Sequence, residues 1–167
     1  MNILVTGGAG YVGVPLVTAL LDAGHQVTIV DNFMFGFESV LHLVSRPNLK
    51  MIKTDVRNED LSYLDDKDVV FHLAAISGYP ECEANPNSAQ RINLDASIRI
   101  AEYLAKDQLL VFASTTSIYG ASGTVSDEET EVAPVSLYGM TKLQAERVIM
   151  QRENSITLSC AARFRVS

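Results

Sequence analysis

A glycine cluster near the N-terminus and an acidic residue after it have the types and order needed to bind a dinucleotide. Gly7-Gly8-Ala9-Gly10-Tyr11-Val12-Gly13 lies between an apolar run and a helix-like segment, and Asp31 ends the second apolar run. Glycine permits a tight turn and lets backbone N–H groups approach a phosphate, whose charge a helix N-terminus stabilises. Two sets of glycines, 8/10/13 and 7/10/13, have suitable spacing. The order strand, glycine loop, helix, strand, acid therefore predicts a dinucleotide site, with a plain tight turn as the alternative.

Asp31 also bears on which dinucleotide is bound. A carboxylate at this place accepts hydrogen bonds from a ribose 2′-hydroxyl and repels a 2′-phosphate. The sequence has no Lys or Arg between Asp31 and Arg46. We therefore expect NAD rather than NADP, the alternative for Asp31 being an ordinary turn residue at the end of a strand.

A second group, Tyr138 and Lys142, is placed for acid–base chemistry. Positions i and i+4 share one face of a helix, so the phenol and the ammonium can point into one cleft. A nearby ammonium favours phenolate and lowers the pKa of a tyrosine toward the working pH. Upstream, Ser114-Thr115-Thr116-Ser117 follows another apolar run and supplies hydroxyls that could bind a reacting oxygen. Alone, these residues would be read as surface polar groups and a polar turn.

The elements that must position these residues alternate between strands and helices. Apolar, β-branched runs predict strands at 2–6, 26–30, 49–53, 68–73, 109–114 and 156–162, and longer patterns predict helices at 11–23, 57–63, 88–106 and 138–152. Such alternation predicts an α/β fold with a doubly wound parallel sheet. The loops 74–87 and 115–137 leave carboxyl ends of strands and should line the site. Helix 88–106 is apolar on more than one side, which suggests a partner subunit.

Composition narrows the class of protein further. The chain has 167 residues, 47% of them hydrophobic, and a net charge of −7, so we expect a single domain over 1–167. Its basic residues are scattered, which argues against nucleic acid or an acidic membrane as partner, and no metal site is expected. No run approaches the ~20 apolar residues of a membrane span, and no charged lead-in suggests a signal peptide. Cys82 and Cys160 are expected to be free thiols in a reduced cytoplasm.

Taken in order, the motifs resemble one family. The glycine loop, Asp31, Asp55-Val56, His72-Leu73-Ala74-Ala75, Asn93, Thr115 and Tyr138/Lys142 resemble the extended short-chain dehydrogenase/reductases, especially nucleotide-sugar epimerases and dehydratases such as UDP-galactose 4-epimerase. The resemblance spans the whole chain and implies an NAD(P)-binding Rossmann fold.

The resemblance also implies roles for individual residues. It assigns Gly7, Gly10, Tyr11 and Val12 to the pyrophosphate, Asp31 and Asn32 to the adenosine ribose, Asp55 and Val56 to the adenine, and Leu73, Ala74 and Ala75 to the floor under the cofactor, with Asn93 supporting that loop. It makes Tyr138 the acid/base on a sugar hydroxyl. Lys142 would hold the nicotinamide ribose and lower the pKa of Tyr138, and Thr115 would bind the reacting oxygen.

Within the family, the residues after Thr115 separate the reactions. Dehydratases resemble one another in an Asp-Glu pair after this threonine, and decarboxylases carry a Glu two positions after it, whereas this chain has Thr116 and Ser117. The resemblance therefore favours an epimerase that oxidises a sugar hydroxyl to a ketone and then returns the hydride from NAD. A keto-sugar reductase remains open, and Ser77 stands where galactose epimerases carry a lysine.

The resemblance implies a substrate and a partner as well. The substrate would be a UDP-, dTDP- or GDP-linked sugar, and the partner a second copy docked through helices 88–106 and 138–152. The family's segments that form the nucleotide-sugar pocket follow the point where this sequence ends, so we expect that C-terminal portion to be missing here. A non-catalytic NAD-binding module and a structural subunit with relic motifs are the other classes considered.

Overall fold

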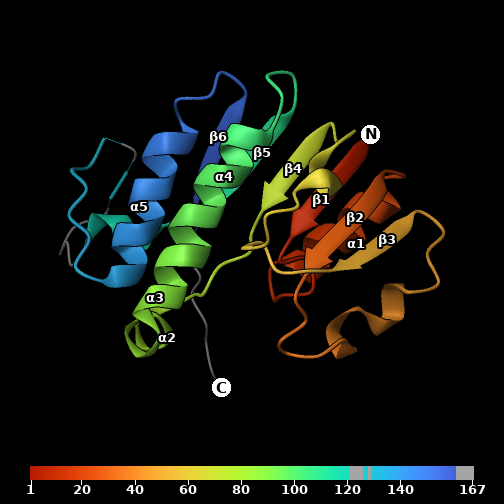
Figure 1. Ribbon diagram of the computed structural model, residues 1–167, viewed down its shortest axis with the longest axis horizontal. Coiled ribbons are helices and arrows are strands. Elements are labelled where there is room, and N and C mark those ends of the chain that lie inside the picture. Colours follow the sequence, from red (N-terminus) through yellow and green to blue (C-terminus); the bar gives the residue numbers. More distant parts are fainter. Residues whose placement is uncertain (121–125, 128, 161–167) are drawn as a thin grey trace.

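Six parallel strands form one sheet in this computed structural model, which describes residues 1–120, 126–127 and 129–160 (Figure 1). The spatial order is β3-β2-β1-β4-β5-β6. The strands are β1 (Asn2–Thr6), β2 (Gln26–Asp31), β3 (Leu49–Lys53), β4 (Val69–His72), β5 (Leu109–Thr115) and β6 (Ser155–Cys160). Every pairing between neighbours is parallel, which confirms the α/β doubly wound fold. The final two residues expected in the last strand, 161 and 162, lie outside the described residues.

Two apolar layers cover the sheet, one on each face. On one face, α1 (Gly13–Asp22) and the 3-10 helix η1 (Glu38–Leu43) bury Val17, Leu21 and Val40 against strand residues such as Ile3 and Ile29. On the other face, Ile100 of α4 (Ala96–Tyr103) and Ile149 of α5 (Leu137–Ile149) pack against Leu4, Val70 and Leu110. Successive strand residues point to opposite faces, so both faces of each central strand are buried, and the strands read as continuous apolar runs.

The helix expected at 57–63 is wrong, because only a short 3-10 turn, η2 (Ser62–Leu64), forms there. The Asp60 carboxylate takes the Ser62 N–H, a backbone donor that such a helix would pair with the Asn58 carbonyl. The carboxylate of Asp55 accepts from the Arg57 N–H at 2.9 Å, and that of Asp60 accepts from the Ser62 N–H at 2.9 Å. Such local bonds compete with helix formation, and the sequence pattern does not distinguish the two outcomes.

The segment expected as a loop at 74–87 is partly helical. It contains α2 (Tyr79–Ala84), and α3 (Pro86–Ala89) then leads without interruption into the π-helical turn η3 (Gln90–Asp95) and α4. Pro80 and Pro86 do not prevent this, because both occupy the first turn of a helix, where a missing N–H costs nothing. The helix expected at 88–106 therefore begins earlier and ends at Tyr103, before the extended Leu104.

The second apolar side of this helix is covered within the chain. On that side, Leu94 and Ala101 are buried in one cluster with Ala145 and Ile149 of α5, and Ile98 packs against it. Figure 1 shows α4 and α5 side by side over β4, β5 and β6. The pattern that suggested a partner subunit is thus accounted for by α5, which the sequence had not placed there.

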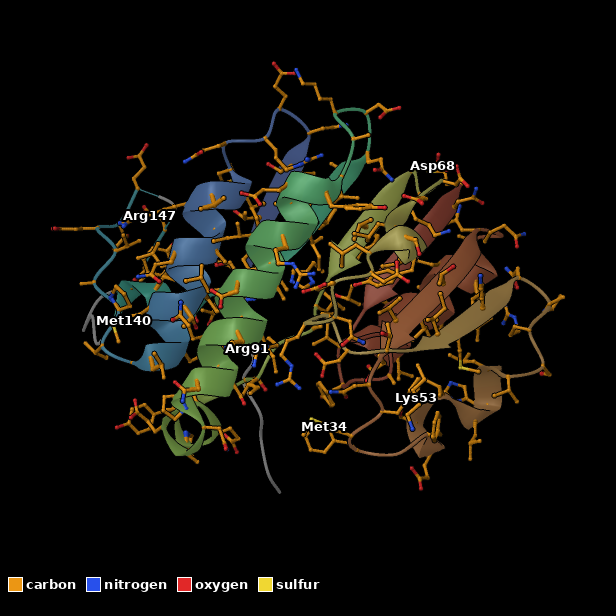
Figure 2. The ribbon with its side chains drawn as sticks, viewed as in Figure 1. Met34, Lys53, Asp68, Arg91, Met140 and Arg147 are labelled. Carbon is orange, nitrogen blue, oxygen red and sulfur yellow. The ribbon has the colours of Figure 1, made fainter. Side chains whose placement is uncertain are left out.

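The sheet order changes direction at its middle and so fixes where a ligand can bind. The chain runs outward from β1 to β3 and then returns to add β4, β5 and β6 on the other side. In such folds the crevice outside the carboxyl ends, at this switch point, takes the ligand. Figure 2 shows Asp68, which precedes β4, at the upper edge and Met34, which follows β2, toward the lower edge, where the strands end. Among the described residues no helix is long and apolar enough to cross a membrane.

Candidate active site

A cleft of about 860 Å³ opens at the carboxyl ends of the strands. Its walls come from the segments that follow β1 to β5 and from the first turns of α5. It is lined by the residues singled out from sequence, apart from Asn93: Gly7, Gly10, Tyr11, Val12, Asp31, Asn32, Asp55, Val56, Leu73, Ala74, Ala75, Thr115, Tyr138 and Lys142. Residues more than 100 positions apart in the sequence thus share one cavity, about the size of a cofactor site.

The glycine loop fits tightly between β1, α1 and the segment after β4. Gly7 has φ +69°, and a Cβ there would lie 2.8 Å from the Ala74 nitrogen. A Cβ on Gly13 would collide with the Gly7 carbonyl oxygen, so α1 could not begin where it does. A Cβ on Gly8 would lie 2.9 Å from Cγ1 of Ile29. The strictest backbone demands therefore fall on Gly7 and Gly13, which favours the 7/10/13 spacing over 8/10/13.

The first turn of α1 carries no acidic side chain of its own. Its N-cap, Val12, makes no side-chain hydrogen bond, and its first turn holds no acidic residue. The partial positive charge of this end therefore faces the cleft, where Gly10 and Tyr11 are exposed. A phosphate fits the chemistry of this end.

Asp31 connects the glycine loop to the end of β2. Its carboxylate accepts hydrogen bonds from the Ala9 N–H at 3.1 Å and the Phe33 N–H at 2.9 Å. The side chain is half-buried and still lines the cleft. It can therefore present carboxylate lone pairs to a ribose while its position is fixed by the backbone.

The next part of the cleft carries a second carboxylate, Asp55, held by an arginine. Both oxygens of Asp55 accept from the Arg57 guanidinium, at 2.8 Å each, and Asn32 donates to one of them at 3.4 Å. These bonds, above all those from Arg57, lower the pKa of Asp55 to about 2. Asp55 is thus ionised at neutral pH, and the one cation beside it is already paired.

The floor of the cleft, Leu73 to Ile76, is fixed at both ends. Thr6 accepts a hydrogen bond from the Ala74 N–H through its hydroxyl at 3.2 Å. Asn93 is fully buried, and its amide accepts from the Ile76 N–H at 2.8 Å and donates to the Ile76 carbonyl at 2.9 Å. Asn93 therefore lies behind the cleft, where its side chain holds Ile76. It sits in the π-helical turn, a distortion often found near functional sites.

Tyr138 and Lys142 project from the start of α5. The helix is capped by Ser136, whose hydroxyl accepts from the Gly139 N–H at 3.1 Å. Tyr138 is half-buried, whereas Lys142 is only 2% exposed, with its Nζ 3.9 Å from the centre of the Phe112 ring. A cation over an aromatic face is stabilised electrostatically, which offsets part of the cost of burying it. Lys142 is the only cation among the described residues that line the cleft.

Thr115 stands at the end of β5, where its hydroxyl caps the 3-10 turn η4 (Thr116–Tyr119). It accepts from the Ser117 N–H at 3.1 Å and donates to the Ser117 hydroxyl at 3.2 Å. Thr116, Ser117 and Ser136 line the same part of the cleft. This end of the cleft is rich in hydroxyls, and the carboxylates among the described lining residues, Asp31 and Asp55, both lie on the far side.

Sequence reasoning missed two residues that shape this end. A Cβ on Gly139 would lie 2.7 Å from the Ser117 carbonyl oxygen, so only glycine lets α5 approach η4 this closely. Phe112, fully buried, supplies the ring under Lys142. Gly139 directly follows Tyr138 and could have been noticed as a helical glycine with a packing reason. Phe112 looked like any core residue of a strand.

The fold and the cleft together define a dinucleotide-binding Rossmann domain with a tyrosine–lysine pair in the same cleft. Residues 3–161 match the NAD dependent epimerase/dehydratase family, and the chain belongs to that family. The family is NAD-dependent, in agreement with the cofactor expected from Asp31.

Relatives and solved structures agree with this assignment. The chain is 37% identical to an uncharacterized UDP-glucose epimerase of Bacillus subtilis over 89% of its own length and 50% of that protein. It is 35% identical to a bifunctional UDP-glucose 4-epimerase and UDP-xylose 4-epimerase of Pisum sativum, over 88% of this chain and 46% of the relative. A UDP-glucuronic acid 4-epimerase from Bacillus cereus, solved with NAD, superposes with a TM-score of 0.86 at 30% identity, covering 95% of this chain and 55% of that one. The chain thus spans about half the length of the relatives it matches.

Proposed function

We propose that this chain is the cofactor-binding and catalytic portion of an NAD-dependent nucleotide-sugar epimerase. The observation that carries the proposal is that one cleft joins the glycine loop and Asp31 to Thr115, Tyr138 and Lys142. A UDP-linked sugar is the first candidate substrate, because the relatives are named for UDP-sugars; dTDP- and GDP-linked sugars are the alternatives.

In this proposal Tyr138, Lys142 and Thr115 each have a separate role in the reaction. NAD, when bound, supplies the hydride acceptor. Tyr138, as phenolate, takes the proton of the sugar hydroxyl as the carbon beneath it is oxidised, and it later returns that proton to the ketone oxygen. The Lys142 ammonium favours the phenolate and binds the nicotinamide ribose. Thr115 donates its hydroxyl to the reacting oxygen, for which it must turn away from Ser117.

An epimerase is favoured over a dehydratase or decarboxylase by the lining of the cleft. Elimination of water needs an acid and a base next to the sugar, and the described positions after Thr115 offer only the hydroxyls of Thr116 and Ser117. Epimerisation needs no further proton carrier, because the ketone turns over and the hydride returns to its other face. A keto-sugar reductase would use the same residues and is the second candidate.

The experiment is to incubate the NAD-loaded protein with UDP-glucose and related UDP-sugars. An epimerase gives the C4 epimer without net NADH, measured by chromatography of the sugars and by nicotinamide absorbance. Stoichiometric NADH without an epimer would support an oxidoreductase instead. Absence of both products with NAD bound would favour a non-catalytic module.

We propose two further properties. A homodimer through α4 and α5 is supported by their place side by side on the outside of the sheet (Figure 1) and by exposed Met140. A cytoplasmic location is supported by the cysteine content, which is too small for a disulfide framework. We also take residues 1–167 to fold as one domain.

A further inference from the structure

A row of buried polar side chains passes through the core directly behind the floor of the cleft. Thr6, His72 and Ser97 are each at most 1% exposed. Nδ1 of His72 lies 2.7 Å from the Thr6 hydroxyl, and its Nε2 lies 2.9 Å from the Ser97 hydroxyl. His72 does not line the cleft and takes no part in the proposed reaction. Buried polar groups need partners, and here each one has them.

The direction of each hydrogen bond follows from counting hydrogens. Ser97 has a single hydroxyl hydrogen and donates it to the Asn93 carbonyl at 2.8 Å. Ser97 must then accept from His72, which places a proton on Nε2. Thr6 accepts from the Ala74 N–H and can donate its own hydrogen to Nδ1 of His72. A neutral imidazole protonated on Nε2 satisfies every group in the row.

We propose that His72 is a positioning residue which, as the neutral Nε2–H tautomer, fixes both ends of the cofactor floor. Through Thr6 it holds Ala74, and through Ser97 it holds the backbone of Asn93, whose side chain binds Ile76. Asn93 Nδ2 also lies 3.5 Å from the Thr141 hydroxyl, which donates to the Tyr138 carbonyl at 3.0 Å. The row therefore joins the floor to the first turn of the helix that carries Tyr138. Any effect of His72 on NAD binding rests on the proposed function, whereas the tautomer of His72 does not.

A charged His72 would not fit this arrangement. If Nδ1 carried a proton, the Thr6 hydroxyl would have to accept a hydrogen bond from it. The Thr6 hydroxyl hydrogen would then lose Nδ1 as its acceptor. The His72 ring stacks on Phe112 with centroids 5.8 Å apart, and the Lys142 ammonium lies on the same ring, so a second cation would face the first. Lys142 is the charged group that acts on His72 among the described residues. Burial first and Lys142 second lower the pKa of His72 to about 3.

The direct test is long-range ¹H–¹⁵N correlation of histidine-labelled protein without added NAD. We expect one histidine, assigned by its loss in His72→Gln, with a protonated Nε2 and a bare Nδ1 that do not change between pH 8 and pH 5. A proton on Nδ1, or titration near the ordinary value of about 6.5, would overturn the proposal. This measurement does not need NAD binding.

Two isosteric variants test the positioning role. The amide nitrogen of His72→Gln can replace the donor to Ser97, whereas the shorter His72→Asn can replace only the acceptor for Thr6. Amide hydrogen exchange should then speed up about tenfold or more at Ala74 in the Gln variant and at Ile76 in the Asn variant. Equal loss of protection throughout the sheet, or no change at either amide, would contradict a positioning role.

NAD affinity completes the comparison. Calorimetry should show a Kd for NAD raised about tenfold in His72→Leu and less in His72→Gln, which keeps the link to Asn93. If wild type binds no NAD, the proposed function fails, while the tautomer and the exchange pattern still decide the role of His72. If wild type binds NAD and His72→Leu binds it with an unchanged Kd, then His72 does not position the cofactor floor.

Discussion

Gly139 of α5 packs directly on the backbone of Ser117, because a Cβ at position 139 would lie 2.7 Å from the Ser117 carbonyl oxygen. This contact brings the residue before it, Tyr138, to the turn that holds Thr115. We predict that Gly139→Ala displaces the start of α5 and lowers kcat/KM for epimerisation by about 100-fold, as misplacement by about 1 Å can. Steady-state kinetics on wild type and variant would measure the loss.

Gly139→Ala should also change the free energy of unfolding. The sign of the change depends on whether position 139 is open or tightly packed against Ser117. Alanine in an open helix position gains about 1 kcal/mol over glycine. Overpacking against Ser117 should instead destabilise the protein by about 1–3 kcal/mol. Urea unfolding followed by circular dichroism distinguishes them, and a more stable Gly139→Ala variant would show that the contact imposes no constraint.

Asp31 should set the preference for NAD over NADP. Asp31→Asn removes the charge that repels a 2′-phosphate but keeps an oxygen that can accept from Ala9 or Phe33. We predict that the ratio of the two Kd values shifts toward NADP by about tenfold, or about 1.4 kcal/mol, in isothermal titration calorimetry. Asp107→Asn, which removes the same charge at an exposed position that does not line the cleft, serves as the control. An unaltered ratio would mean that Asp31 serves only the turn.

Tyr138→Phe should separate chemistry from cofactor binding. The variant keeps the ring and the helix but loses the phenol that carries the proton. We predict a Kd for NAD within about twofold of wild type, together with loss of all sugar-dependent hydride transfer, because no other described group beside Thr115 can replace an acid/base of this kind. Stopped-flow absorbance of the nicotinamide measures the transfer. Wild-type activity in this variant would rule out Tyr138 as the acid/base.

The buried histidine should leave a signature in the pH dependence of stability. In the unfolded chain His72 gains a proton below about pH 6.5, but in the folded chain its pKa is lowered to about 3. The unfolded state therefore binds more protons between these values, so stability falls as pH is lowered through this window. The slope from this residue approaches about 1.4 kcal/mol per pH unit.

The control for this slope is His72→Gln, which cannot titrate. Urea unfolding at pH 6.5, 6.0, 5.5 and 5.0 should give a shallower decline for the variant than for wild type, whatever their absolute stabilities. Parallel lines for the two proteins would mean that His72 is protonated as readily folded as unfolded.

The proposed dimer can be tested on α5. Met140 is 42% exposed on this helix, so Met140→Arg should leave the fold intact while placing a charge in an interface formed by α4 and α5. We predict a dimer for wild type and a monomer for Met140→Arg in light scattering. Val44→Arg, at an exposed site beside η1, should remain dimeric. A monomeric wild type at high concentration would contradict the dimer.

The sequence predicts the strands and the residues that line the cleft, because both depend on residue types that are close together in the chain. Continuous apolar runs such as Ile3-Leu4-Val5 are buried on both faces, and strand boundaries accordingly agree within a residue or two. The motif residues reach one cleft because the carboxyl ends of parallel strands meet at one edge of the sheet. The topology of the sheet therefore brings residues that are far apart in the sequence into one candidate site.

What could not be read from sequence depends on contacts between distant segments. Residues 57–61 have helix-compatible types, but the Asp60 carboxylate takes the Ser62 N–H, which the helix would need. The sequence pattern suggests a partner for the side of the helix that carries Leu94 and Ala101, because nothing in the sequence states that α5 lies beside α4. Likewise, Phe112 contributes to the site only through the contact of its ring with Lys142, which lies on a later helix. The sequence does not show that contact.

Native mass spectrometry of the purified chain with NAD tests the central proposal most directly. We predict one NAD per chain for wild type and none for Gly10→Asp, which places a negative charge where the pyrophosphate would meet α1. A Cβ at position 10 would lie 3.2 Å from the Gly7 carbonyl oxygen, so the loop needs to shift by only a few tenths of an ångström. Ser45→Asp adds the same charge at an exposed distant site and should retain NAD. A wild-type chain that stays free of NAD under titration, or a Gly10→Asp variant that binds it equally well, would contradict the assignment of this cleft as the cofactor site.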